Sequence, residues 1–210
     1  MDVSATFAPG RLHVLRGAEG EGRNLLLRYL GLLQVPEIGE VLVEGHATRA
    51  LAETARAELR TQRFGFVFSA PFLLSSFSVI ENVAMPLFKI SQVGPDEARS
   101  RTETLLQFVG LAEAAQASVD DLPMDAQFRV ALARGLINDP SFLLVENVDG
   151  ALTGDELSSF ITLLHQVSET RGITVIATSS ACAWPEGTRL LDVAGGRITL
   201  DSELLPEIGS

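Results

Sequence analysis

Short apolar runs alternate along the chain with longer stretches of helical periodicity. The apolar runs predict strands at residues 11–16, 38–44, 64–68, 141–145, 174–178, 189–193 and 197–200. The amphipathic or apolar stretches between them predict helices at residues 24–33, 50–62 and 155–170. Strands that alternate with helices favour an α/β fold with a largely parallel sheet, and the last two strands, joined through Gly195 and Gly196, form a hairpin.

The middle of the chain has a different character. From residue 79 to residue 136 the periodicity is helical, with breaks at Gly94 and Pro95 and again near Pro123. We therefore expect an α/β core made of residues 1–78 and 137–210, interrupted by a mainly helical subdomain at residues 79–136.

The charge of the chain narrows the possible partners. Its 27 acidic and 16 basic residues give a formal net charge of −11, and residues 106–210 hold most of the excess acid. Such a surface repels phosphate backbones, so nucleic acid is not an expected partner. No run reaches the ~18 apolar residues of a membrane span, and the first residues lack a basic signal region, so we expect a cytoplasmic protein.

Scarce residue types exclude several kinds of site. A single cysteine, Cys182, cannot form an internal disulfide, and the three histidines lack the spacing of a zinc motif, so no metal site is expected. Lysine occurs once, at Lys89, among fifteen arginines. Any mechanism that depends on a lysine would have to use Lys89.

A glycine-rich turn lies between the first predicted strand and the first predicted helix. Gly17, Gly20 and Gly22 have the GxxxxG spacing of a phosphate-binding loop, whose backbone N–H groups point at an anion. The motif continues with Lys and Ser or Thr, but this chain has Arg23 and Asn24. Arginine brings a planar fork in place of a slim ammonium, and asparagine is a poor magnesium ligand, so the loop is degenerate.

Two carboxylates add to the mismatch. Glu19 and Glu21 lie inside the loop that should surround an anion, where each would repel it unless its side chain turns outward to solvent. A glycine-rich turn that never binds phosphate is the alternative interpretation of this segment taken alone.

Further runs complete an ordered set of motifs: AELR at 57–60, FGFVF at 64–68, VIENVAMPL at 79–87, LLQFVGL at 105–111, RVALARGLINDP at 129–140 and GGRIT at 195–199. This order resembles the ATP-binding subunits of ABC transporters, and within them the lipoprotein-release and macrolide-export branch. The resemblance covers about residues 3–200. It implies a P-loop NTPase fold, a three-layer core with an inserted helical subdomain, and ATP hydrolysis coupled to transport.

The same resemblance shows which positions of this chain correspond to the family's ATP-binding and catalytic residues. The residues at those positions differ from the ones that the family uses. The Q-loop glutamine is replaced by Ser69, and the signature LSGGQ reads Leu-Pro-Met-Asp-Ala. In that signature Pro123 lacks a backbone donor, while Met124 and Asp125 add bulk and negative charge where glycines should approach a phosphate.

The end of the Walker B strand and the H-switch are altered as well. Glu146 and Asn147 stand where the family has Asp and Glu, and an amide cannot act as a general base. Thr153 replaces the D-loop aspartate, and Ser179 replaces the H-switch histidine.

These replacements predict a cassette-like protein that has lost ATP hydrolysis, because phosphoryl transfer depends on positioned charge and metal. It would act as a structural or regulatory partner of a transmembrane permease, of another ABC ATPase subunit, or of a second copy of itself. We expect no bound cofactor, and weak binding of ATP or ADP is the open alternative. We also expect the protein to attach to the inner face of the cytoplasmic membrane. The competing hypothesis is a divergent active ATPase that uses Arg23 and Glu146.

An apolar cluster near residues 69–87 is the expected docking face for such partners. It consists of Phe72, Leu73, Leu74 and Phe77. Their spacing also suits buried positions, and a core role is the interpretation that the spacing favours.

Overall fold

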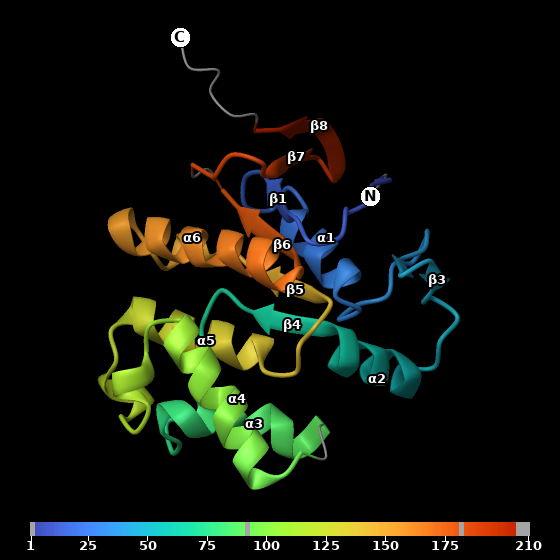
Figure 1. The fold of residues 1–210 in the computed structure, drawn as a ribbon. Coiled ribbons are helices and arrows are strands. Elements are labelled where there is room, and N and C mark those ends of the chain that lie inside the picture. Colours follow the sequence, from blue (N-terminus) through green and yellow to red (C-terminus); the bar gives the residue numbers. More distant parts are fainter. Residues whose placement is uncertain (1–2, 91–92, 181–182, 205–210) are drawn as a thin grey trace.

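A six-stranded sheet with the order β4-β5-β6-β1-β7-β8 forms the centre of the molecule (Figure 1). The computed structural model describes residues 3–90, 93–180 and 183–204, without the side chains of residues 89, 90 and 148. Cys182 and the side chain of Lys89 therefore lie outside the described residues. Parallel pairing joins β4 (Phe64–Val67), β5 (Phe142–Val145), β6 (Thr174–Ser179), β1 (Leu12–Arg16) and β7 (Arg189–Ala194).

The final strand, β8 (Arg197–Glu203), pairs antiparallel with β7. Gly195 and Gly196, which connect the two strands, both have positive φ, as a tight hairpin turn requires. The predicted terminal hairpin is therefore confirmed.

Successive residues of the parallel strands enter two separate apolar cores. Leu143 and Val145 of β5 pack into the core beneath α5 (Met124–Leu136) and α6 (Gly154–Arg171). Leu144, between them, packs into the core that contains Leu26 and Leu27 of α1 (Arg23–Leu30). A sheet buried on both faces explains why its strands are continuously apolar, and it confirms the predicted α/β fold of three layers.

Close packing of α5 on β4 depends on two glycines. A Cβ atom added to Gly65 would lie 2.2 Å from the carbonyl oxygen of Gly135. Only glycine at residue 65 therefore lets this helix approach the strand so closely.

The predicted helical region contains α3 (Val79–Ile90), α4 (Pro95–Phe108) and α5, with short 3-10 turns at Ala112–Ala114 and Val119–Asp121. Helix α5 contacts both α3 and strand β4, so it belongs to the helical region and to the main core at once. The domain boundaries at residues 79 and 136 stay a prediction. None of the helices in the described residues has the length and apolarity needed to cross a membrane.

The predicted edge strand at residues 38–44 is wrong. Only β2 (Leu42–Val43) forms there, and it pairs with β3 (His46–Ala47) in a separate two-stranded sheet. Positive φ at Gly39 and Gly45 bends the chain on both sides, and Ile38 is 90% exposed. Helix α2 (Glu53–Arg63) then leads into β4 as expected.

Candidate functional site

The glycine-rich turn between β1 and α1 lies at the carboxyl ends of the parallel strands. Its first residue, Gly17, donates its amide to the carbonyl of Ser179 at 3.2 Å, and a Cβ there would lie 2.3 Å from the carbonyl oxygen of Val193. Gly20 and Gly22 have φ of 84° and 104°, so the turn uses the freedom that only glycine gives cheaply. The backbone thus has the form that the spacing predicts.

Glu21 turns away from the centre of the loop. Its carboxylate accepts a hydrogen bond from the amide of Gly195, and its carbonyl accepts one from Gly196 at 3.0 Å. Glu19 is exposed. Glu19 thus lies at the surface, as the outward alternative expects, whereas Glu21 ties the loop to the β7–β8 hairpin.

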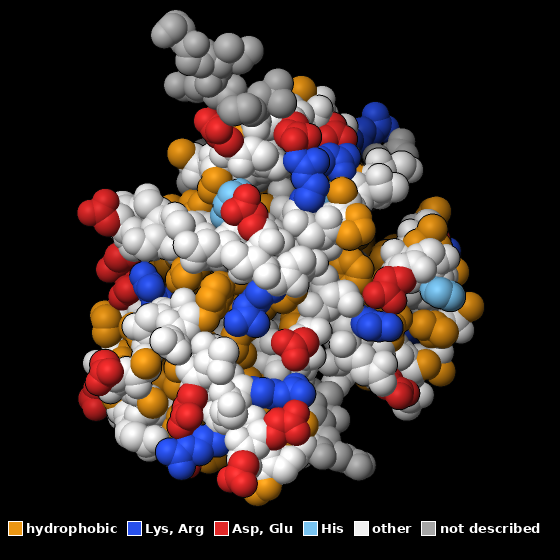
Figure 2. Space-filling model, viewed as in Figure 1, with side chains coloured by type: hydrophobic (Ala, Val, Ile, Leu, Met, Phe, Trp, Pro, Cys, Tyr) orange, Lys and Arg blue, Asp and Glu red, His pale blue; other side chains and the backbone are white. Residues whose placement is uncertain are grey.

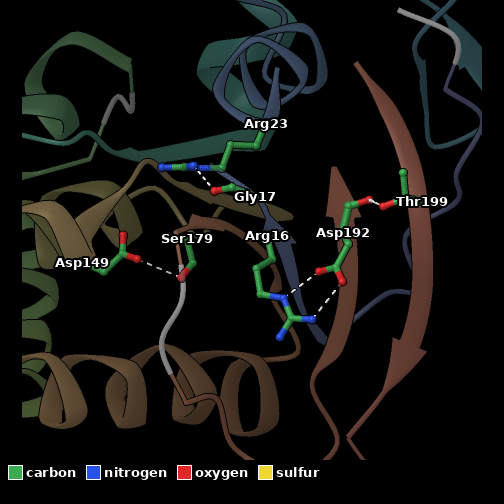
Figure 3. A network of polar contacts seen from close by, with 7 residues as sticks. All are labelled: Arg16, Gly17, Arg23, Asp149, Ser179, Asp192 and Thr199. Atoms are coloured by element: carbon green, nitrogen blue, oxygen red, sulfur yellow. Dashed lines mark hydrogen bonds and ion pairs between the residues drawn. The ribbon is translucent and has the colours of Figure 1, made fainter. Parts of the chain in front are cut away.

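Arg23 folds back into the site and is only 3% exposed. Its guanidinium donates to the carbonyl oxygen of Gly17 and, at 2.6 Å, to Oδ1 of Asn147 (Figure 3 draws the contact with Gly17). One side chain therefore bridges the start of the glycine-rich turn and the segment that follows β5.

Asn24 occupies the next position, in the first turn of α1. Its Oδ1 is buried and has no hydrogen-bond partner among the described residues. Helix α1 begins without a side-chain cap, since Gly22 is its N-cap residue. Its first amides are therefore left open at the end where a helix attracts anions.

Glu146 directly follows β5 and is 7% exposed. Its Oε1 lies 3.1 Å from Nη2 of Arg28, a residue of α1. A burial this deep requires the carboxylate to have a charged partner, and Arg28 supplies it. Arg28 was not expected from the sequence, because the i,i+5 spacing from Arg23 does not place the two side chains on one face of the helix.

Asn147 has a left-handed backbone, with φ of 47°. Its amide donates to Oγ1 of Thr178 at 2.9 Å, and its side chain accepts from Arg23. Asparagine tolerates this φ better than most residues, so both its backbone and its carboxamide have a structural role here.

Ser179 ends β6 and is fully buried. Its hydroxyl donates to Oδ2 of Asp149 at 2.9 Å (Figure 3), and the same oxygen accepts from the amide and the hydroxyl of Ser180. Asp149 therefore holds the ends of β5 and β6 together. Within the described residues no group of three or more histidine, cysteine or acidic side chains could hold a metal ion.

Beside the loop, Arg16 and Asp192 form a two-pronged ion pair, with Nε–Oδ1 and Nη2–Oδ2 distances of 2.6 and 2.9 Å (Figure 3). The hydrogen bonds from Arg16 lower the pKa of the Asp192 carboxyl, and those from Asp192 raise the pKa of Arg16. The pair fixes β1 to β7 immediately before the turn begins.

Comparison with known proteins decides the family. Residues 1–148 match the sequence profile described as ABC transporter. This chain is a member of the ABC transporter family. Whether it belongs to the lipoprotein-release and macrolide-export branch stays a prediction.

Solved ABC cassettes have the same fold. MJ0796, a bacterial ABC transporter cassette solved as a dimer, matches with a TM-score of 0.86 and 26% identity, over 97% of this chain and 89% of that chain. Its dimer in a post-hydrolysis state, bound to ADP and phosphate, matches at 0.84 and 25%, with the same coverage. CbiO1 from Clostridium perfringens, part of the ABC transporter complex CbiONQ, matches at 0.84 and 22%, over 95% of this chain and 79% of that one.

The remaining ABC positions lie apart from the Arg23 contacts. Ser69 is exposed just beyond β4, and Thr153 is exposed at the start of α6. Pro123 is the N-cap residue of α5, Met124 is 46% exposed, and Asp125 pairs with Arg129 at 3.6 Å. In the described part of the chain, no hydrogen bond or ion pair joins these residues to the phosphate loop.

The apolar cluster of this ABC chain is largely exposed, so the favoured core interpretation is wrong for most of it. Phe72, Leu74 and Phe77 are 66%, 40% and 38% exposed, whereas Leu73 packs partly against the core. Asn82, which is fully buried, holds the backbone of this segment by bonding Leu74 N at 2.8 Å and three carbonyl oxygens at 3.1 Å. The backbone of this segment is thus held by a buried polar side chain, while three of its four apolar side chains stay exposed.

A second clamp fixes the same segment. Arg134 of α5 donates to the carbonyl oxygens of Pro71 and Phe72 at 2.7 and 2.8 Å, and its burial lowers its pKa. Phe72 has a φ of 46°, which is costly for an aromatic residue. Buried polar groups therefore hold an exposed apolar segment in a strained shape.

Next to this segment, α3 and α4 enclose an open cavity of about 420 Å³. Phe77, Ile80, Met85 and Phe88 provide much of its apolar lining, and Phe88 is 71% exposed. On the face drawn in Figure 2, hydrophobic side chains lie between interspersed acidic and basic ones.

Proposed function

We propose that this chain is an ABC cassette that no longer hydrolyses ATP and serves as a structural or regulatory partner of transporter components. The observation that carries the proposal is the hydrogen bond from Arg23 to Asn147. It places a neutral amide at the position assigned to the general base, and it uses that amide to hold an arginine. A residue so occupied has neither the proton affinity nor the freedom to activate water.

The other assigned positions support the same conclusion. Ser179 has no imidazole and bonds Asp149. Glu146 already has a cationic partner in Arg28. Asn147, Ser179 and Glu146, at three positions that phosphoryl transfer uses, are thus engaged in contacts within the protein.

Mg²⁺ with ATP, the family's usual ligand, is a poor match for these residues. The guanidinium of Arg23 is already bonded to Gly17 and Asn147, and Glu146 is paired with Arg28. Asn24 provides an amide oxygen in place of the hydroxyl that the motif uses for the metal. We therefore propose that the chain works without a bound nucleotide or metal.

A turnover assay tests the loss of hydrolysis. Purified chain incubated with Mg²⁺-ATP should release no more phosphate than its Gly22→Trp variant, in which a bulky side chain blocks the loop. Phosphate release by the unaltered chain that Gly22→Trp abolishes would overturn the proposal. It would support instead the active enzyme that uses Arg23 and Glu146.

The partner we propose is a transmembrane permease that takes the exposed apolar segment Phe72, Leu74 and Phe77 together with the α3–α4 cavity. CbiO1 is part of an ABC transporter complex, and MJ0796 is a dimer. A homodimer or a mixed pair with another ABC subunit extends the same proposal. The expected location is the cytoplasmic side of the membrane, at its inner face.

Co-purification tests this docking face. A chain co-expressed with a candidate permease should be recovered with it from membranes. Phe72→Asn combined with Phe77→Ser should prevent that recovery, since Asn accepts the positive φ of residue 72. Ile38→Ser is the matched control, because Ile38 is an exposed apolar residue on a different part of the surface. A chain that remains a soluble monomer throughout would contradict docking.

A further inference from the structure

Arg23 is a buried cation whose two partners are both uncharged. Its guanidinium donates to the carbonyl oxygen of Gly17 and to the carboxamide oxygen of Asn147. A guanidinium this deeply buried would ordinarily be paired with a carboxylate. These two oxygens therefore hold the Arg23 guanidinium between the start of the glycine-rich turn and the segment after β5.

The nearby carboxylates are committed elsewhere. Glu146 pairs with Arg28, Glu21 accepts from Gly195 N, and Asp149 accepts from Ser179 and Ser180. No ion pair to Arg23 is found in the described residues. Among the described residues, the side chain of Asn147 is therefore the one anchor of the guanidinium outside the loop.

The anchored guanidinium belongs to a closed circuit of hydrogen bonds. From Gly17 the circuit runs through its amide to the carbonyl of Ser179 at 3.2 Å, and from the Ser179 hydroxyl to Asp149 at 2.9 Å. Gly150 N then bonds the carbonyl of Asn147 at 3.1 Å, and the Asn147 side chain returns to Arg23. Protein groups alone thus connect the ends of β1, β5 and β6.

We propose that Arg23 is an internal occupant of the phosphate loop, held there by Asn147, and that this contact is autoinhibitory toward nucleotides. The inference rests on the proposed loss of hydrolysis and extends it by naming the contact that keeps nucleotide out. The guanidinium belongs to the first residue of α1 and bonds the carbonyl oxygen of Gly17, so it is held inside the loop that a phosphate would enter. A phosphate group must displace it before reaching the open amides of α1.

Two substitutions of Asn147 distinguish an Arg23–Asn147 contact that keeps nucleotide out from one that has no effect on nucleotide binding. Asn147→Gly removes the anchor and suits the φ of 47°, so Arg23 is released and its charge becomes available to a phosphate. Asn147→Asp also tolerates that φ but turns the anchor into an ion pair, which holds Arg23 more firmly. Arg99→Ala removes one positive charge from the exposed surface of α4 and serves as the charge control.

Calorimetric titration with ADP, in Mg²⁺ and again in EDTA, provides the measurement. We expect Asn147→Gly to bind ADP at least tenfold more tightly than the unaltered chain in both conditions. Asn147→Asp and Arg99→Ala should show no gain. Equal affinity of Asn147→Gly and the unaltered chain, or an equal gain in Asn147→Asp, overturns the proposal.

A second substitution covers the case in which Asn147→Gly fails to fold. Arg23→Lys replaces the planar guanidinium with a single ammonium, which cannot span the distance between Gly17 and Asn147. We therefore expect the affinity for ADP to rise at least tenfold in this variant as well. No gain in Arg23→Lys overturns the proposal on its own.

The two proposals fail in different ways. Phosphate release by the unaltered chain contradicts the loss of hydrolysis. Tight ADP binding by the unaltered chain without phosphate release contradicts the internal occupant and the proposed work without nucleotide, but it leaves the loss of hydrolysis intact.

Discussion

Single polar side chains inside this protein have definite structural roles, and His13 of β1 is an example outside the loop. It is fully buried, its Nε2 lies 3.0 Å from the carbonyl oxygen of Ala8, and its Nδ1 has no hydrogen-bond partner within the described parts of the chain. Burial, and to a lesser extent Arg189 and Arg11, lowers its pKa. The folded chain therefore binds a proton at His13 less readily than the unfolded chain.

The first prediction concerns pH. Because the unfolded chain takes up the proton more readily, the contribution of His13 to the free energy of unfolding is complete above pH ~6.5 and is lost as the pH falls through the lowered pKa. Urea unfolding between pH 7.5 and 5 should show falling stability in the unaltered chain, with a slope below about 1.4 kcal/mol per pH unit from this residue. His13→Gln should flatten that slope, and an unchanged slope would contradict the assignment.

For single residues, the sequence identifies which side chains belong to the candidate site but not which groups they contact. Gly17, Gly22 and Arg23 are found from local spacing, because a loop between a strand and a helix is local. The bond from Arg23 to Asn147 joins positions 124 residues apart, and the rotation of Glu21 toward Gly195 spans 174. Such contacts follow from the tertiary packing of the sheet, which periodicity does not specify.

At the scale of elements, the packing of α5 on β4 depends on Gly65 and Gly135. The second prediction is that Gly65→Ala destabilises the fold by ~1–3 kcal/mol, since its Cβ would overlap the carbonyl of Gly135 and push α5 from β4. Chemical denaturation measures the loss. Gly94→Ala is the control, because nothing lies within 4 Å of a Cβ there and its φ of −69° suits alanine.

The third prediction concerns the segment that carries the exposed aromatics. Asn82→Ala removes the bonds to Leu74, Phe77 and Ser78 and leaves their backbone groups without that partner, at a cost of ~1–3 kcal/mol. The free energy of unfolding measured in urea and the amount of chain recovered with a permease should both decrease. The exposed Gln62→Ala, which loses one bond to Glu58, should change neither.

Elements whose local signals agree are the ones that sequence predicts best. Residues 195 and 196 are both glycine between two apolar strands, and the β7–β8 hairpin forms there. At residues 38–44 the alternation of apolar side chains suggests a strand, but the left-handed turns at Gly39 and Gly45 interrupt it. Local backbone geometry overrides hydrophobic alternation at such points.

At the scale of the whole molecule, the question is whether nucleotide changes the assembly. The fourth prediction is that sedimentation velocity gives the same oligomeric state with and without Mg²⁺-ATP. Pro123 lacks a backbone donor and Asp125 adds a carboxylate where a second subunit would contact phosphate, so nucleotide cannot join two copies. A dimer that forms only with Mg²⁺-ATP would contradict this prediction.

The bond between Arg23 and Asn147 also constrains how this protein can change over generations. A single mutation of Asn147 to Glu would place a carboxylate beside a buried guanidinium, and the two would form an ion pair instead of a free base. A single mutation of Arg23 to Lys would remove the bridge while residue 147 remained an amide. Under the proposed loss of hydrolysis, neither change alone supplies both the lysine of the loop and a free general base, so a return to hydrolysis requires both residues to change.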